Sequence, residues 1–190
     1  MEQFNSMARD FKKDLQFAES FQNSPQWTEI YNKAYPDHQS IIIIPGDDKR
    51  QYKGVDCIVE TEHGSLRNVE EKIDSWPPSN MFIEYLSCAE VNTPGWIEYP
   101  AETQDLLYIF VNHGIAYKIN FKHLQAVWKI HKNDWIKRYQ RGASTKSGYG
   151  GYSSLGCAVP VVEVQKAIDE YTRLPKAFMK LIEFNNTSAL

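Results

Sequence analysis

The feature that most constrains the fold is a pair of alternating segments joined by a tight turn. Tyr52–Glu62 and Leu66–Asp74 alternate apolar and polar residues, a period typical of β-strands with one buried face. Between them, Glu62-His63-Gly64-Ser65 is a hairpin-turn signal. We therefore predict two antiparallel strands. One face of the first carries Val55, Cys57 and Val59, and the other carries Asp56, Ile58 and Glu60.

Helical spacing precedes this hairpin. Residues 3–22 carry apolar side chains three and four positions apart, which predicts an amphipathic helix. Ser24-Pro25 is an N-cap followed by proline at the first helical position, so a second helix should run from there to about Ala34. The β-branched run Ser40–Ile44 then predicts a buried strand.

Strand and helix signals are mixed beyond the hairpin. The apolar run within residues 102–112 is compatible with either a helix or a strand. Residues 142–153, rich in Gly, Ser and Tyr, predict a loop. The remaining expected elements are strands at Met81–Cys88, Ile115–Asn120 and Cys157–Val162, and helices at Phe121–His131, Val162–Leu174 and from Pro175 to about Asn185.

The 190 residues show no internal repeat and no linker long enough to separate domains. They predict one domain of the α/β class, in the mixed α+β sense, with a central mixed sheet of four to five strands flanked by helices. We expect residues 1–22 to form an N-terminal helical extension, residues 25–165 the core, and residues 166–190 C-terminal helices.

Composition and cysteine usage narrow the functional class. Apolar residues make up 42%, charged residues 24%, and the formal net charge is -3, so a uniformly basic nucleic-acid binder is not indicated. Cys57, Cys88 and Cys157 are far apart and odd in number, which favours free thiols over disulfides or a zinc site. The N-terminus lacks an apolar signal core and Ile41–Ile44 is too short to cross a membrane, so we expect a cytoplasmic protein without a membrane partner.

Strand parity brings candidate catalytic residues together. In the second hairpin strand Glu70 and Lys72 share one face, while the side chain of Glu71 points to the other. If Asp56 joins Glu70, two carboxylates form a hard-oxygen site for Mg²⁺ or Mn²⁺. A lysine beside them could orient or help deprotonate a metal-bound water, and hydrolysis of a phosphodiester needs such a nucleophile together with positive charge.

The hairpin register decides whether this site forms, and the sequence leaves it open. A register centred on His63-Gly64 places Asp56 opposite Glu71 to within one or two residues, and one residue of slip or a bulge places it beside Glu70. Charges often alternate on exposed strand faces, so Glu-x-Lys alone is a weak signal. Asp56 is more informative because it lies inside an apolar run, where an unpaired carboxylate is costly.

Two segments of the hairpin carry a resemblance to a known family. With Gly54-Val55-Asp56 and Val69-Glu70-Glu71-Lys72-Ile73, the chain resembles the PD-(D/E)xK nuclease superfamily, with Val55 in place of the proline. The resemblance covers about residues 25–165. Further segments that look like a subgroup of small phage and prophage nucleases are Phe82-Ile83-Glu84-Tyr85, Thr93-Pro94-Gly95-Trp96-Ile97, Asp105 and Val159-Pro160.

The resemblance implies a restriction-endonuclease-like core and a set of roles. Asp56 and Glu70 would ligate Mg²⁺ or Mn²⁺, the backbone carbonyl of Glu71 would add a ligand, and Lys72 would be the catalytic lysine. An acidic residue from the first core helix often joins such a site, and Glu29 is the candidate, with Glu19 the weaker choice. A solvated helix face explains either residue as well. Glu84, on the next strand, either supports the site or faces solvent.

Basic residues concentrate in residues 117–146. This segment holds eight Lys and Arg residues against Asp134 alone, although the rest of the chain is acidic. Basic side chains contact phosphates, and interleaved aromatic rings can stack on bases. The alternative is a solvated basic helix with Trp128 in the core. The residues expected to contact nucleic acid are Lys129, Lys132, Lys137, Arg138, Arg141 and Lys146.

These features predict a divalent-metal-dependent nuclease that acts on nucleic acid, DNA rather than RNA, through a metal-activated water. Three alternatives stay open. One is a catalytically inactive protein of the same fold that binds nucleic acid or a protein. Another is a Holliday-junction resolvase, which dimerisation and a preference for four-way junctions would distinguish, so a homodimer is considered. The third is a phage inhibitor or structural protein with an accidental motif.

Overall fold

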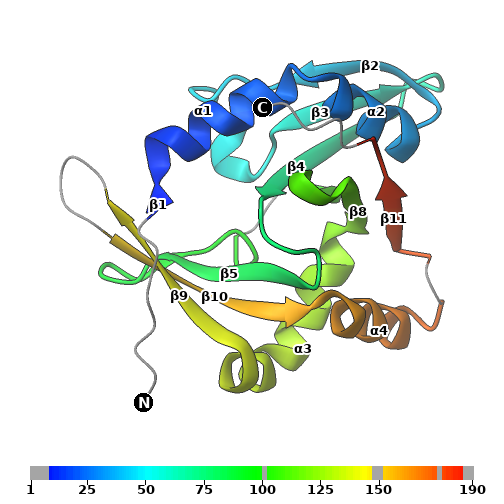
Figure 1. The fold of residues 1–190 in the computed structure, drawn as a ribbon. Helices are drawn as coiled ribbons and strands as arrows, with labels where there is room; N and C mark the ends of the chain where they lie inside the picture. The colour runs from blue at the N-terminus through cyan, green and yellow to red at the C-terminus, as the bar shows by residue number, and fades with distance from the viewer. Residues whose placement is uncertain (1–8, 100–101, 147–151, 175–176, 186–190) are drawn as a thin grey trace.

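The computed structural model describes residues 9–99, 102–146, 152–174 and 177–185, and these residues form a mixed α/β fold (Figure 1). This confirms the predicted class. The α-helices in the described residues are α1 (Phe11–Gln22), α2 (Pro25–Ala34), α3 (Phe121–Tyr139) and α4 (Val161–Thr172). None of these helices combines the length and the apolar character needed to cross a bilayer.

The larger sheet has six strands in the order β11-β8-β7-β4-β3-β2, rather than the four to five expected. Neighbouring strands are antiparallel except β4 and β7, which run parallel. Its strands are β2 (His38–Ile43), β3 (Cys57–Thr61), β4 (Leu66–Asp74), β7 (Asp105–Phe110), β8 (Ile115–Asn120) and β11 (Met179–Glu183).

A second sheet has the order β1-β9-β10-β5-β6, so the expectation of one central sheet is wrong. After β4 the chain leaves the hairpin sheet, and β5 pairs with β10 instead of with β4. The open edge of β4 is taken by β7, whose six residues are all buried and therefore suit an interior strand. The strands of this sheet are β1 (Arg9–Asp10), β5 (Asn80–Cys88), β6 (Thr93–Pro94), β9 (Gln140–Lys146) and β10 (Tyr152–Pro160).

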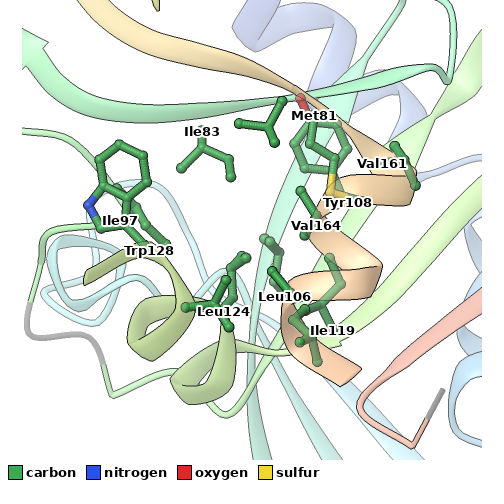
Figure 2. Packing of buried hydrophobic residues seen from close by; sticks show 14 of the residues in the cluster. Met81, Ile83, Ile97, Leu106, Tyr108, Ile119, Leu124, Trp128, Val161 and Val164 are labelled. Atoms are coloured by element: carbon green, nitrogen blue, oxygen red, sulfur yellow. The ribbon is translucent and has the colours of Figure 1, made fainter. Parts of the chain in front are cut away.

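The large sheet is covered on both faces. Helices α1 and α2 lie over one face, and α3, α4 and the smaller sheet lie over the other (Figure 1). Strand β7 contributes Leu107 and Ile109 to the core under α1 and α2. Its alternate residues, Leu106 and Tyr108 among them, face the second core, where they meet Ile83 of β5 and Val164 of α4 (Figure 2). Burial on both faces explains why the sequence of β7 is a continuous apolar run.

Several predicted elements are confirmed. Helix α2 spans Pro25–Ala34, and the Ser24 hydroxyl caps it by accepting from the Trp27 N–H at 3.2 Å. Strands β4 and β8 occupy Leu66–Asp74 and Ile115–Asn120 as expected. The helix expected over residues 3–22 begins only at Phe11, because Arg9–Asp10 pair with β9 as strand β1, and residues 3–8 lie outside the described residues.

Other predicted elements are wrong for identifiable reasons. Strand β2 is an edge strand rather than a buried one, with Ile42 48% exposed. The helix expected after Pro175 is replaced by β11, because the free edge of β8 takes up its backbone hydrogen-bonding groups, so residues 166–190 are not all helical. Much of the loop predicted over residues 142–153 pairs as β9 and β10, and residues 147–151 lie outside the described part.

Candidate functional site

A three-residue turn sets the register of the β3–β4 hairpin. The Thr61 N–H donates to the Ser65 carbonyl at 2.9 Å, which leaves residues 62–64 as the loop, and Gly64 adopts the left-handed conformation with φ of 72°. This combination is a common three-residue hairpin connection. Cys57 therefore pairs with Val69, and Asp56, one residue outward, lies beside Glu70. Of the two registers that the sequence left open, the structure has the one that joins the carboxylates.

Asp56, Glu70 and Lys72 lie together on one face of the large sheet. Glu70 and Lys72 are in register with Leu106 and Tyr108 of β7, so they point toward α3 and the smaller sheet. The Lys72 ammonium forms an ion pair with Glu70, whose side chain is buried. Asp56, Glu70 and Lys72 therefore share one face, as the proposed site requires.

Burial and mutual repulsion of two carboxylates dominate the electrostatics of this cluster. Burial and the neighbouring Glu70 raise the pKa of Asp56 to about 7, although Lys72 and the Glu71 N–H oppose the shift. Burial disfavours the charge on Lys72, but Glu70 and Asp56 together raise its pKa above the usual range. One lysine faces two carboxylates, so a further cation would be bound favourably here.

Glu71 contacts Asp56 through its backbone and helix α2 through its side chain. Its backbone N–H donates to Asp56 Oδ2 at 2.7 Å, and since the N–H and C=O of a strand residue point the same way, its carbonyl lies along the same edge. Its buried carboxylate instead accepts from Trp27 Nε1 and Tyr31 OH, both at 2.7 Å, and from Gln22 Nε2 at 2.8 Å. Sequence reasoning missed this anchoring, although Trp27 and Tyr31, four apart on α2, present polar tips from one helix face.

Glu29 does not join the pair. It lies on α2, on the opposite side of the large sheet from Glu70, where it pairs with Lys33 at 2.7 Å and accepts from the Asn185 N–H at 3.2 Å. Glu19 is exposed on α1 on that same side. Asp105 also faces α2, and holds Arg67 through two hydrogen bonds of 2.7 and 2.8 Å. The acidic residue that does face the site is Glu84 of β5.

Glu84 and Glu70 line a recess of about 260 Å³ between the two sheets. Glu84 is close enough to Lys72 to help raise the pKa of that lysine. Aromatic residues form much of the remaining wall, and sequence spacing gave no sign that they converge. They are Tyr52, Trp96, Tyr99 and Phe121.

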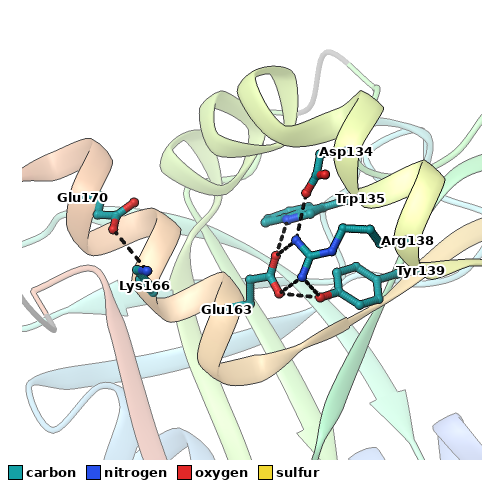
Figure 3. Close-up of polar contacts among 7 residues, drawn as sticks. All are labelled: Asp134, Trp135, Arg138, Tyr139, Glu163, Lys166 and Glu170. Carbon is teal, nitrogen blue, oxygen red and sulfur yellow. Dashed lines mark hydrogen bonds and ion pairs between the residues drawn. The ribbon is translucent and has the colours of Figure 1, made fainter.

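The basic segment divides into structural and exposed residues. Arg138 is bound by Glu163 of α4 at 2.8 Å, and Glu163 also accepts from Trp135 and Tyr139, so this arginine ties α3 to α4 (Figure 3). Lys132 pairs with Glu98 at 2.6 Å, and Glu98 is two residues along the chain from Trp96.

Three other predicted contacts are exposed: Lys129, Lys137 and Arg141. Burial acts to raise the pKa of the Glu98 carboxyl, but the net shift is downward. The hydrogen bond from Lys132 lowers this pKa most, and the nearby charge of Lys129 lowers it further. Lys146 pairs in β9 through its backbone, and its side chain lies outside the described part. Lys129 and Lys132 therefore lie near Glu98, in the segment that carries Trp96 and Tyr99, and Arg138 is bound by Glu163.

The donor set fits a divalent ion that keeps much of its water. Within the described residues, no group of three His, Cys, Asp or Glu side chains could hold a metal alone. Asp56, Glu70 and the Glu71 carbonyl offer two carboxylates and one neutral oxygen. Mg²⁺ usually binds proteins through one or two carboxylates, several waters and substrate phosphate oxygens. These residues suit such an ion better than a fully protein-coordinated one.

Comparison of the chain with protein-family models, with curated proteins and with solved structures gives no match. The geometry of the site is therefore the basis for inferring the function of this chain.

The Glu71 carboxylate should be important for stability. Glu71→Ala leaves three donors on α1 and α2 without their acceptor, two of them buried, and should lower the free energy of unfolding by about 2–4 kcal/mol. Chemical denaturation measures this. Glu62→Ala, in the exposed hairpin loop, is the matched control and should change stability little. Equal effects of the two substitutions would contradict the anchoring role.

Asp56→Asn should stabilise the metal-free protein. The folded pKa of Asp56 lies above its usual value of 3.8, so ionisation of Asp56 costs stability as the pH rises from there to about 7. An amide keeps the acceptor for the Glu71 N–H without the charge. Above neutral pH, in chelator, we expect a melting temperature higher by about 2–6 °C, measured by calorimetry. A lower melting temperature would show that the charge of Asp56 does not destabilise the metal-free protein.

Proposed function

We propose that this chain is a divalent-metal-dependent nuclease whose active site is Asp56, Glu70 and Lys72, with the Glu71 carbonyl as a further ligand. The observation that carries the proposal is the convergence of these side chains on one face, beside a recess open to a substrate. Two carboxylates that can hold a divalent ion, with a lysine beside them, can supply the nucleophile and the positive charge that hydrolysis of a phosphodiester requires.

Each residue has a distinct role in the proposed reaction. A bound Mg²⁺ or Mn²⁺ would supply an activated water and a positive charge for the phosphate. Asp56 and Glu70 would hold the ion, and the Asp56 carboxylate is itself oriented by the Glu71 N–H. Lys72, between Glu70 and the Trp96 ring, would position the water and stabilise charge on a phosphate oxygen. The water oxygen forms a bond to phosphorus as the bond to the leaving oxygen breaks.

A restriction-endonuclease-like core is part of the proposal. Helix α2 is followed by the antiparallel strands β2, β3 and β4, and β7 then adds parallel to β4, which supports that relationship. The connection between β4 and β7 runs through β5 and β6 of the second sheet rather than through a helix. This departure makes the site geometry a firmer basis for the proposal than the topology.

DNA is the proposed substrate, in keeping with the basic residues of α3 that lie near Glu98, in the segment that also carries Trp96 and Tyr99 of the recess. Lys129 and Lys132 would contact the backbone close to the site, and Lys137 and Arg141 farther along it. Arg138 contributes less in this proposal, because Glu163 and Asp134 already neutralise it.

The proposal is tested by incubating the purified chain with Mg²⁺ or Mn²⁺ and plasmid DNA, linear duplex, single-stranded DNA or RNA. We expect cleavage of at least one substrate that chelator abolishes. Glu70→Gln and Lys72→Ala should each slow it by about 100- to 1000-fold, the scale of losing one group that stabilises the transition state. Gel electrophoresis of the products measures the rate.

Lys166→Ala is the matched control for Lys72→Ala. Lys166 lies on the exposed face of α4, 3.7 Å from Glu170, so its removal should leave cleavage unchanged. The proposal fails if none of these nucleic acids is cut with either metal, or if Lys72→Ala cuts as fast as the original chain.

A further inference from the structure

Four aromatic rings from three segments of the chain line the recess beside Glu70. Tyr52 comes from the turn before β3, Trp96 and Tyr99 from the segment after β6, and Phe121 from the start of α3. Tyr52 is 75% exposed and Tyr99 is also exposed, whereas Trp96 is half-buried and Phe121 is buried. Two exposed rings beside a half-buried one at the same recess indicate a binding surface, because burying the exposed rings elsewhere would stabilise the fold.

The backbone holds Trp96 in place before any ligand arrives. The Gly95 N–H donates to the Tyr85 carbonyl at 2.8 Å, and the Ile97 N–H donates to the Glu84 carbonyl at 3.3 Å. A Cβ atom at Gly95 would lie 2.4 Å from the Glu84 carbonyl oxygen, so only glycine permits this close approach to β5. The Lys72 ammonium lies 5.9 Å from the centroid of the Trp96 ring. The ring is therefore fixed next to the proposed reacting group.

The size and the charge of the recess restrict what enters it. Its volume of about 260 Å³ is just below the range of about 300–1,000 Å³ that holds a drug-sized ligand, so it accommodates one small planar group. Glu70 and Glu84 in its wall disfavour a phosphate inside, whereas their oxygens accept from ring amino and imino groups. Aromatic rings around hydrogen-bond acceptors suit a flat heterocycle that carries N–H donors.

We propose that the recess binds one unpaired nucleobase, so that the substrate class of the site is nucleic acid with at least one unstacked base. The inference rests on the proposed function, because the scissile phosphate is what brings a nucleotide beside Lys72. A base in a matched duplex is stacked and paired on both sides, and extruding it costs a few kcal/mol. Single strands avoid that cost and gain the stacking energy of each base on an aromatic ring.

Binding to labelled oligonucleotides in chelator tests this without any need for cleavage. Fluorescence anisotropy should show a single strand bound at least tenfold more tightly than its matched duplex. Tyr52→Ala and Trp96→Ala should each weaken single-strand binding by about 5- to 100-fold, the range expected for one base stack. Tyr171→Ala, which removes an exposed tyrosine on α4, should leave binding unchanged. A duplex with one mismatch binds more tightly than the matched duplex if extruded bases also enter.

Conservative variants separate stacking from a loss of folding. Trp96→Phe and Tyr52→Phe keep a ring and should retain most of the affinity, whereas Trp96→Leu should not. If Trp96→Ala lowers the melting temperature strongly, the affinity of Tyr52→Ala for single strands decides the question, because Tyr52 is exposed. The inference is overturned if matched duplex binds as tightly as single strand, or if Tyr52→Ala and Trp96→Ala behave like Tyr171→Ala.

These outcomes are independent of those that test the nuclease proposal. Tight, Trp96-dependent binding of single strands without cleavage by Mg²⁺-loaded or Mn²⁺-loaded protein keeps the inference and rejects the nuclease. Metal-dependent cleavage of duplex DNA that Trp96→Ala and Tyr52→Ala leave unchanged keeps the nuclease and rejects the base-binding recess.

Discussion

The hydrogen bond from the Glu71 N–H to the Asp56 carboxylate, 2.7 Å long, is the contact on which the site depends. It exists because the three-residue turn ending at Gly64 places Asp56 beside Glu70 rather than one residue away. A slip of one residue would turn every side chain of β3 to the other face, exposing Cys57 and Val59 and burying Glu60. The core under α1 and α2 therefore enforces the register that brings the carboxylates together.

Strand β4 links the stability of the fold to the chemistry of the site. On one face Glu71 is held by Trp27 and Tyr31 of α2, and on the other Glu70 lines the recess and pairs with Lys72. The arrangement sets two carboxylates side by side at a cost in stability, a pattern common where proteins bind cations or carry out catalysis. Satisfied hydrogen bonds on the α2 side and the buried apolar run of β7 offset that cost.

Local patterns predicted the parts of this structure that depend on nearest neighbours. The alternation of residues 52–74 placed Asp56 opposite the apolar face, and Ser24-Pro25 located the start of α2. The register was left open because it depends on the left-handed conformation of Gly64. The run Leu106–Val111 did not distinguish helix from strand, since burial on both faces removes any period. The pairing of β5 with β10, and with it the meeting of Tyr52 and Trp96 at one recess, arises from contacts between distant segments that no local pattern encodes.

The proposed reaction requires that Asp56 and Glu70 jointly hold a divalent ion. Anomalous X-ray scattering from crystals of the chain grown with Mn²⁺ would locate that ion. We expect one strong peak between the two carboxylates, at about 2.1 Å from an oxygen of each, as is usual for small divalent ions. The Glu71 carbonyl should lie in the same coordination sphere, and Lys72 should have moved from Glu70 toward the bound water. Saturating Mn²⁺ with no peak at this position, and Lys72 still paired with Glu70, would show that Asp56 and Glu70 do not form a metal site.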